Sequence, residues 1–123
     1  MPKKRIMVVD DSASLRELVS ATLGSAGNEV IEAANGEQAL KMLNGEKIDL
    51  IVCDVLMPLM DGITFVKHAK AMPDYRFVPI IMLTTESSEK TKLKGQTAGA
   101  KAWLVKPFQP ERLLHAVLKL ILP

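Results

Sequence analysis

The sequence of 123 residues contains a single cysteine, Cys53, and aromatic residues make up only 4% of it. A lone cysteine cannot form an internal disulfide, which excludes a disulfide-held secreted fold and favours a cytoplasmic protein. Cys53 ends an apolar run and is interpreted as a small buried apolar side chain, not as a redox sensor. The two histidines, His68 and His115, lack the spacing to cysteine or carboxylate ligands that a zinc site needs.

Long hydrophobic runs are also missing, and the net charge is only +2. No apolar stretch approaches the length of a membrane span. Residues 1–5 lead into an apolar run of four residues, which is too short for the core of a signal peptide. So small a net charge argues against nucleic-acid binding driven by the overall electrostatic field. We therefore expect a cytoplasmic monomer that binds neither membranes nor nucleic acid.

Four short apolar runs are each followed by polar residues suited to bind a metal ion or a phosphoryl group. The runs cover residues 6–9, 50–53, 80–83 and 102–105, and the residues that follow them are Asp10 with Asp11, Asp54, Thr84 and Lys106. The runs do not alternate with polar residues, which is typical of strands buried on both faces of a parallel sheet. The carboxyl ends of such strands lie along one edge, where open α/β sheets bind ligands.

Segments with helical periodicity separate the apolar runs. The first covers residues 15–26, and it starts at Ser12 or Ser14 and stops at Gly27. A shorter helix starts at Asn35 and ends at Asn44 and Gly45, and another follows Asp61 and Gly62. The last covers residues 113–121, with Pro110 in its first turn. Val30 and Ile31 indicate a weaker second strand. This order predicts an α/β fold with a doubly wound, five-stranded parallel sheet and helices on both faces. Five strand–helix units use residues 1–123, so we expect a single domain with no output domain.

The fourth predicted helix, Glu86 to Thr97, has a weak helical signal. It has one large apolar residue, Leu93, an internal glycine, Gly95, and three closely spaced lysines. Low helix propensity and a thin apolar stripe predict a marginal helix that few contacts hold in place. Two interpretations stay open, a solvated surface helix and an element that moves.

Three carboxylates are expected together in the proposed pocket, those of Asp10, Asp11 and Asp54. Two unit charges about 4 Å apart repel by roughly 4 kcal/mol at an effective dielectric constant near 20, so protonation or a cation must compensate them. Mg²⁺ prefers oxygen ligands and takes one or two carboxylates together with phosphate oxygens. Asp10 and Asp11 could supply metal ligands, while Asp54 could attack phosphorus and form an aspartyl phosphate.

The remaining two strand ends carry groups that suit a phosphoryl product. The Lys106 ammonium can neutralise a phosphoryl oxygen, and the Thr84 hydroxyl can donate a hydrogen bond to another. Taken singly, each residue has an ordinary structural interpretation, such as a helix N-cap for Asp11 or a surface lysine for Lys106. Four strand ends that carry complementary groups together favour a functional site.

Four motifs in this order and spacing resemble the receiver domain of two-component response regulators. They are residues 8–12 (VVDDS), 53–62 (CDVLMPLMDG), 83–85 (LTT) and 106–108 (KPF). The resemblance covers the whole chain, and because no output domain is expected, the protein looks like a stand-alone receiver of the CheY type in bacterial chemotaxis. It implies a flavodoxin-like sheet of strand order 2-1-3-4-5.

The resemblance also implies roles for individual residues. Asp54 would accept a phosphoryl group from a histidine kinase of the CheA type. Mg²⁺ would be held by Asp10, Asp11, Asp54 and the backbone carbonyl of Leu56. Thr84 and Lys106 would bind the phosphoryl oxygens, and the Lys106–Pro107 bond would be cis. Such a protein is a regulator, not an enzyme, and promotes only its own phosphorylation and dephosphorylation.

In this family the threonine shifts toward the phosphoryl group while an aromatic residue on the last strand swings inward. The aromatic position falls on Trp103, where many members carry tyrosine or phenylalanine. Leu56 is a second departure, because chemotaxis members often have asparagine there, whereas Glu86 agrees with the chemotaxis pattern. An apolar Leu56 is expected to change water access and hence the hydrolysis rate of the phosphoryl group.

The resemblance predicts that a partner such as a flagellar motor component docks on residues 86–122. The residues expected on this face are Lys90, Lys92, Lys94, Trp103, His115 and Lys119. The main alternative is a phosphorelay intermediate or phosphate sink with no motor binding. A small Mg²⁺-dependent phosphatase is a more remote alternative, because the chain leaves no room for a substrate lid. A nucleotide or flavin binder is disfavoured, because no glycine-rich phosphate-binding motif is present.

Overall fold

The computed structural model describes residues 3–121. Outside the described residues lie Met1, Pro2, Pro123 and Leu122, which is the last residue of the predicted docking face. The strands are β1 (Arg5–Val9), β2 (Glu29–Ala33), β3 (Leu50–Cys53), β4 (Ile80–Thr84) and β5 (Ala102–Val105). The helices are α1 (Ala13–Ser25), α2 (Gly36–Met42), α3 (Gly62–Ala71), the 3-10 helix η1 (Pro73–Tyr75), α4 (Glu89–Ala98) and α5 (Pro110–Ile121). Every predicted apolar run lies within an observed strand, which confirms the strand predictions.

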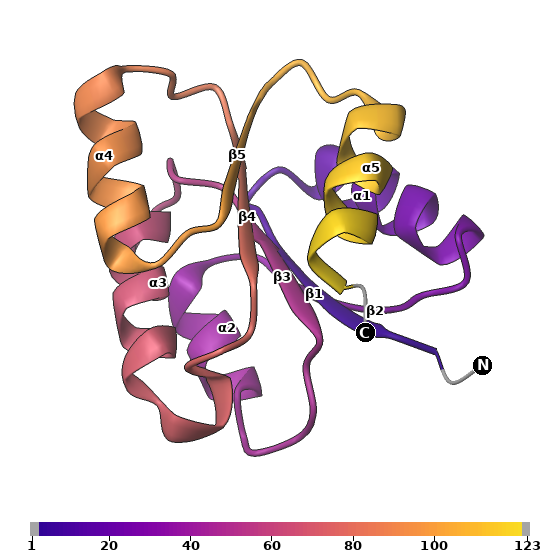
Figure 1. The fold of residues 1–123 in the computed structure, drawn as a ribbon, viewed down its shortest axis with the longest axis horizontal. Helices are drawn as coiled ribbons and strands as arrows, with labels where there is room; N and C mark the ends of the chain where they lie inside the picture. Colours follow the sequence, from indigo (N-terminus) through magenta and orange to yellow (C-terminus); the bar gives the residue numbers. More distant parts are fainter. Residues whose placement is uncertain (1–2, 122–123) are drawn as a thin grey trace.

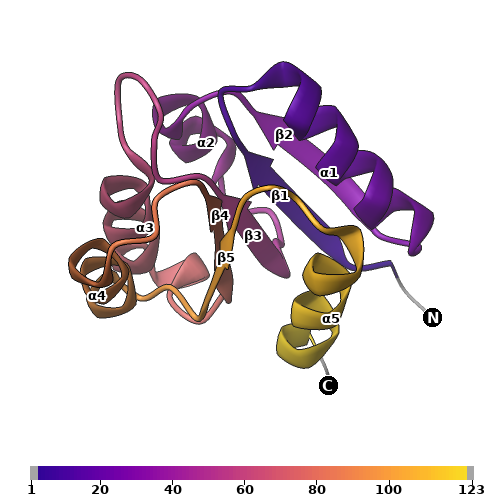
Figure 2. The ribbon, with the colours of Figure 1, turned by 90° about the horizontal axis from the view of Figure 1, so that it is seen from above.

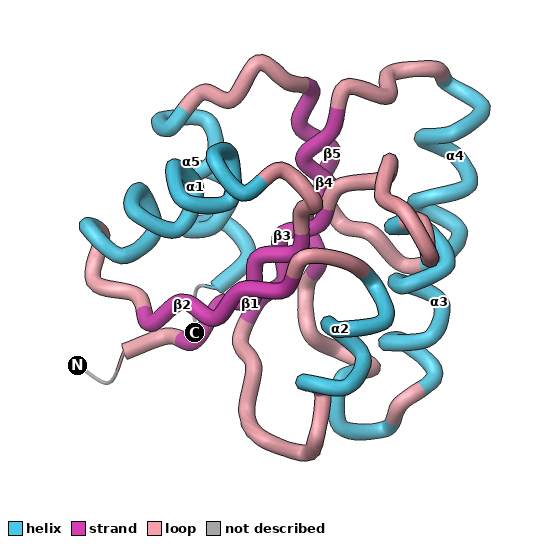
Figure 3. The backbone as a smooth tube through the Cα atoms, turned by 180° about the vertical axis from the view of Figure 1, so that it is seen from behind, coloured by secondary structure: helices cyan, strands magenta, loops and turns pink. Residues whose placement is uncertain are grey.

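The five strands form one parallel sheet in the order β2-β1-β3-β4-β5, as predicted (Figures 1 and 3). Strand β1 pairs with β2 on one side and with β3 on the other, so the order in which strands are added to the sheet reverses at β1. A doubly wound sheet has its ligand crevice at such a switch point, outside the carboxyl ends of the strands. The strands next to this crevice, β1 and β3, are the ones that Asp10 and Asp54 follow.

Helices cover both faces of the sheet: α2, α3 and α4 lie on one side, and α1 and α5 on the other (Figure 2). Successive residues of the buried strands point to opposite faces, so Met7 belongs to the core under α3 whereas Val8 belongs to the core under α1 and α5. Both faces are therefore apolar, which explains the continuous apolar runs in the sequence. Among residues 3–121, no helix is both long enough and apolar enough to cross a bilayer.

Side-chain caps begin four of the helices close to the positions that the sequence predicts. The side chains of Ser12, Asn35, Asp61 and Ser88 each accept a hydrogen bond from the backbone N–H three residues later. Such a cap is typically worth about 1 kcal/mol, because it satisfies a donor that the helix leaves free. Of the two predicted starts of α1, the structure uses Ser12. Helix α2 ends at Met42, two residues before the predicted stop at Asn44.

Helix α4 differs from its prediction in both extent and contact. It runs from Glu89 to Ala98, starting three residues later than expected, because Ser88 provides the N-cap. Leu93, the one large apolar residue of the predicted helix, is 63% exposed, and Gly95 is the buried residue of the helix. The helix packs along α3, its Ala98 contacts the core, and Gly95 lies against the Trp103 ring on β5, so no stripe of large apolar residues holds it.

Candidate functional site

All four predicted strand ends meet at one edge of the sheet. Asp10 follows β1, Asp54 follows β3, Thr84 ends β4 and Lys106 follows β5. Asp10 and Asp54 are 4% and 5% exposed, and Thr84 is completely buried. Asp11, by contrast, is exposed. Parallel pairing of strands distant in sequence is what brings these side chains together.

The Lys106 ammonium joins two of the carboxylates directly. Its Nζ lies 2.8 Å from Oδ2 of Asp54 and 3.2 Å from Oδ2 of Asp10. Burial disfavours the ammonium, but the hydrogen bond to Asp54 and the charge of Asp10 outweigh it, so the pKa of Lys106 is raised. One half-buried cation thus serves two buried anions.

The charge of this pocket is not balanced by Lys106 alone. Burial raises the pKa of Asp10 despite the opposing hydrogen bond from Ser12 and the charge of Lys106. The raised pKa of Lys106 indicates that its charged ammonium form is stabilised. The raised pKa of Asp10 indicates that the nearby positive charge and hydrogen bonds do not fully offset the cost of burying its carboxylate. Burial is the main cause for Asp10, and the charge of Asp54 adds to it, while Lys106 gains from both carboxylates that it contacts. The pocket is therefore suited to take up a further cation.

The carboxylates meet the requirements of a divalent metal site. Each of Asp10, Asp11 and Asp54 offers an oxygen, and these oxygens lie within 4.8 Å of one another. Hard oxygen donors and an exposed side that water can reach are what Mg²⁺ requires. The Leu56 backbone N–H donates to Oδ1 of Asp54 over 3.2 Å. The predicted role of the Leu56 carbonyl as a ligand stays a prediction.

Backbone contacts that the sequence did not reveal hold Asp10 in place. Its Oδ1 accepts a hydrogen bond of 2.9 Å from the Ser12 N–H. Its carbonyl accepts one of 2.7 Å from Arg16, whose Nε also donates to Glu32 over 3.1 Å. The only sequence signal for Arg16 is its place one helical turn after the Ser12 cap, on the side of the helix nearest the strand end. Arg16 is therefore a supporting residue of the site.

The loop from β3 to α3 is tightly folded around Asp54. A Cβ built on Gly62 would overlap the Asp54 carbonyl oxygen and lie 2.9 Å from Cα of Val55, so only glycine fits. Within the loop, the Met60 N–H donates to the Pro58 carbonyl over 2.7 Å, which closes a three-residue γ-turn. Its central residue, Leu59, has a φ of 71°, which is uncommon outside glycine.

A chain of two hydrogen bonds links Thr84 to Trp103. Oγ1 of Thr84 accepts a bond of 3.2 Å from the Glu86 N–H, and the Glu86 carbonyl accepts one of 2.9 Å from Nε1 of Trp103. The Lys106 N–H donates to the Thr84 carbonyl over 2.8 Å. The Lys106–Pro107 bond is cis, as predicted.

The predicted docking residues lie on two sides of the edge strand β5 (Figure 1). Trp103, His115 and Lys119 line a groove of about 530 Å³ between β5 and α5. On α4, Lys90 and Lys94 are exposed, while Lys92 is half-buried with its Nζ 3.8 Å from Glu89. The residues thus form one extended face over α4, β5 and α5 instead of a single cluster.

Comparison with known families and proteins gives a consistent picture. A family model described as the response regulator receiver domain matches residues 6–118. The alkaline phosphatase synthesis transcriptional regulatory protein PhoP of Bacillus subtilis is 42% identical over 97% of this chain and 48% of its own length. The phosphate regulon transcriptional regulatory protein PhoB of Escherichia coli is 37% identical over 98% of this chain and 54% of its own. The chain spans about half the length of the curated relatives it matches.

Solved structures are similar over nearly their whole length. The chemotaxis protein CheY4 of Vibrio cholerae superposes with a TM-score of 0.93 at 45% identity, covering 97% of this chain and 99% of that one. The receiver domain of the sensor histidine kinase PA1611 of Pseudomonas aeruginosa superposes with a TM-score of 0.89 at 28% identity, covering 98% of each chain. That structure has a magnesium ion coordinated in its active site cleft.

Proposed function

This chain belongs to the response regulator receiver domains, and from that premise we propose that Asp54 is its phosphoryl acceptor. Receiver domains are phosphorylation-activated switches that accept a phosphoryl group from a histidine kinase and bind Mg²⁺ in an acidic site. The position of Asp54 carries the proposal: its Oδ2 lies 2.8 Å from the Lys106 ammonium, and it shares the pocket with Asp10 and Asp11. Asp10 also pairs with Lys106, over 3.2 Å, but the motif of residues 53–62 supports Asp54 as the acceptor of the two.

The residues present are suited to the transfer itself. An Asp54 oxygen attacks phosphorus, an O–P bond forms, and the bond from phosphorus to the imidazole nitrogen of the donor breaks. The leaving imidazole takes up a proton. Lys106 exchanges part of its contact with the two carboxylates for the incoming phosphoryl oxygens, and the Thr84 hydroxyl turns to donate to another of them. Bound Mg²⁺, held by Asp10, Asp11 and Asp54, would supply charge neutralisation.

Phosphorylation then changes the balance of charge and hydrogen bonds at the site. The aspartyl phosphate carries close to two negative charges where the Asp54 carboxylate carried one, so about one negative charge is added beside a lysine that already serves two carboxylates. The Thr84 hydroxyl can donate to the new group while its oxygen accepts from the Glu86 N–H, so a shift of Thr84 toward the phosphoryl group would strain that bond. To move the populations of two states from 1:99 to 99:1, phosphorylation must favour the active state by roughly 5.5 kcal/mol of free energy.

For the output, we propose docking of a partner on the face that combines Lys90, Lys92, Lys94, Trp103, His115 and Lys119. Residues 1–123 would then act as one cytoplasmic, monomeric receiver whose output depends on that partner. The similarity to CheY4, a chemotaxis protein, supports a CheA-type kinase and a motor component as the partners. The relation to PhoB and PhoP, which are transcriptional regulators, keeps a different output open. A phosphorelay intermediate or phosphate sink is the second candidate, and Leu56, which is 53% exposed beside Asp54, favours it by departing from the chemotaxis pattern.

Intact-mass spectrometry with Mg²⁺ and a small phosphodonor tests the acceptor. The expected result is the gain of one phosphoryl group, absent in Asp54→Asn and retained in the matched control Asp74→Asn, whose carboxylate is exposed outside the pocket. A gain that persists in Asp54→Asn would refute the assignment. Phosphoryl exchange with a histidine phosphotransfer domain, without binding to an acidic motor peptide, would favour the relay over the motor effector.

A further inference from the structure

The loop between β3 and α3 is closed at its base and extends outward at its tip. At the base, the Gly62 N–H donates to the Val55 carbonyl over 2.8 Å, and Gly62 lies directly against the Asp54 carbonyl. At the tip, residues 56–60, the side chains of Leu56 and Leu59 are 53% and 76% exposed. The contacts at the base do not reach the tip, so other side chains must hold the tip in place.

The side chain of Met60 anchors the tip on helix α2. Met60 and Met57 are half-buried and pack against the core on the α2 and α3 side of the sheet. A Cβ built on Gly36, the buried first residue of α2, would lie 3.0 Å from both Cγ and Sδ of Met60 and 3.1 Å from its Cβ. Contacts of a Cβ atom are rarely so short, so the glycine lets Met60 lie closer to the helix backbone than another residue would.

The tip also carries the peptide that faces the metal site. The Leu56 N–H donates to Oδ1 of Asp54 over 3.2 Å, and the Leu56 carbonyl is the predicted metal ligand. Between Leu56 and Met60 the backbone has little freedom, because Pro58 fixes one dihedral angle and the γ-turn centred on Leu59 is closed by a hydrogen bond of 2.7 Å. A displacement of Met60 is therefore passed back to the Leu56 peptide.

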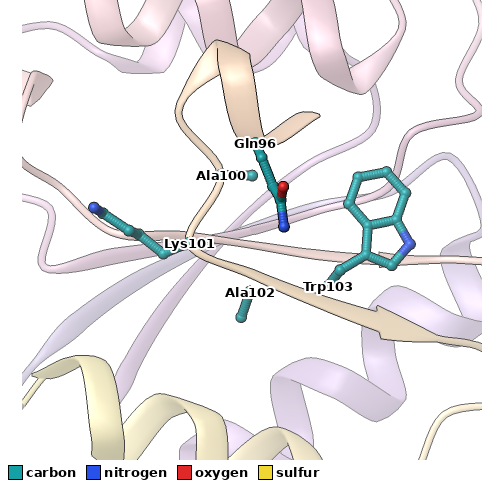
Figure 4. Close-up of a pocket in the computed structure, with 5 residues that line it drawn as sticks. All are labelled: Gln96, Ala100, Lys101, Ala102 and Trp103. Atoms are coloured by element: carbon teal, nitrogen blue, oxygen red, sulfur yellow. The ribbon is translucent and has the colours of Figure 1, made fainter. Parts of the chain in front are cut away.

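Helix α4, on the same side of the sheet, attaches less closely than α2 does at this point. Beside α4 a pocket of about 340 Å³ opens against β5, and the residues that line it are Gln96, Ala100, Lys101, Ala102 and Trp103 (Figure 4). Side chains there have room to adjust when the helix shifts. At α2 the Met60 side chain fills the space in front of Gly36, so the loop tip and the helix are tied to each other.

We propose that Met60 is a positioning residue of the metal site. In contact with Gly36, it holds the loop tip so that the Leu56 peptide faces the Asp54 carboxylate, and it links helix α2 to the occupancy of the site. The inference rests on the proposed function, because the ion is the one that the three carboxylates would hold. Mg²⁺ tolerates only a narrow range of ligand distances, so the tip is restrained more strongly when the site is filled, and Met60 passes this restraint to α2.

Titration calorimetry with Mg²⁺ alone tests the positioning role. Met60→Ala should bind Mg²⁺ about tenfold more weakly than the wild type, which is the usual effect of removing a residue that supports a metal ligand. Met60→Leu keeps an apolar side chain of similar volume and should bind nearly as tightly as the wild type. Met72→Ala is the matched control, because Met72 packs against the same core at the C-terminal end of α3, and it should keep the wild-type affinity.

A double-variant cycle tests the contact between Met60 and Gly36. Gly36→Ala pushes Met60 away and should also weaken Mg²⁺ binding, whereas Gly24→Ala, with open space around its added Cβ in helix α1, should not. Gly36→Ala combined with Met60→Ala should be no weaker than Met60→Ala alone, because the added methyl then has no side chain to displace.

Amide hydrogen exchange gives a readout that needs no metal. In the metal-free protein, Met60→Ala should accelerate exchange in residues 55–61 and in α2, residues 36–42, and Met60→Leu should restore it. In the wild type, Mg²⁺ should slow exchange in both segments, but in Met60→Ala it should slow exchange in residues 55–61 alone.

The outcomes separate this inference from the proposed function. Wild-type Mg²⁺ affinity in Met60→Ala, or additive losses in the double variant, would overturn the positioning role. Mg²⁺ that slows exchange in residues 55–61 of the wild type but not in α2 would overturn the link to the helix. If the wild type binds no Mg²⁺, the proposed metal site and the positioning role both fail, and exchange in the metal-free variants still decides whether Met60 holds the tip on α2.

Discussion

Replacing Leu59 by glycine should stabilise the protein, although it removes a large apolar side chain. Leu59 is the central residue of the γ-turn in the loop after Asp54, with a φ of 71°, and it is the one non-glycine residue with positive φ in residues 3–121. A Cβ clashes with the backbone in this region, whereas glycine adopts it freely. The substitution Leu59→Gly therefore removes strain from the folded state.

The size of the effect follows from three terms. A residue held in such a conformation stores about 1–3 kcal/mol. The glycine costs about 0.4–1 kcal/mol by giving the unfolded chain more freedom. Because Leu59 is 76% exposed, the apolar burial lost is small, roughly 0.5 kcal/mol. At mid-range values the free energy of unfolding rises by about 1 kcal/mol, or roughly 4 °C in Tm for a domain of this size.

Urea denaturation of the wild type, Leu59→Gly and Leu59→Ala measures this difference. Alanine keeps the Cβ and hence the strain, so Leu59→Ala should be no more stable than the wild type. The reasoning is refuted if the glycine variant is no more stable than the alanine variant. An equal gain in both variants would instead point to the exposed leucine side chain as the source of the instability.

Two further predictions concern the same pocket. Gly62→Ala should destabilise the fold by about 3 kcal/mol in urea denaturation, because the added methyl overlaps the Asp54 backbone; a loss below 1 kcal/mol would contradict that contact. Asp10→Asn should raise stability at pH 7 without metal by about 1 kcal/mol, because burial of the charged Asp10 carboxylate costs more than its contacts with Ser12 and Lys106 return. The pKa of Asp10 in the folded protein lies above its ordinary value of 3.8, so the folded protein binds this proton more tightly than the unfolded chain does. The stability of the wild type therefore falls as pH rises from 3.8 through the folded pKa, and the advantage of the variant should shrink as pH is lowered toward 4. Added Mg²⁺ should stabilise the wild type and not this variant, and an equal shift in both would refute the role of Asp10.

The sheet could be predicted because its signals are local and repeated. Runs such as Leu50 to Cys53 are apolar without alternation, which in a short segment identifies a strand buried on both faces. The starts of α1 and α3 follow from Ser12 and Asp61, whose side chains cap the chain within three residues. Strand order required more than these signals, and it came from the motifs shared with the receiver family.

The members of the site could also be predicted, but their pairing could not. Polar residues directly after parallel strands must share an edge, so Asp10, Asp54 and Lys106 were expected together. That Lys106 contacts both carboxylates depends on side-chain reach across three strands. The support from Arg16 was missed, because a lone arginine in an amphipathic helix looks like any exposed one.

By itself, the sequence determined which segments are buried strands, where helices begin and which chemical groups collect at the sheet edge, because each of these depends on residues near one another along the chain. Only the tertiary structure decided how α4 attaches. Leu93 is the one large apolar residue of that segment and is exposed, whereas a glycine in contact with an indole leaves no hydrophobic signal in its own segment. Such a contact joins two elements by shape, and complementarity of shape between Gly95 and Trp103 exists only once both elements are in place.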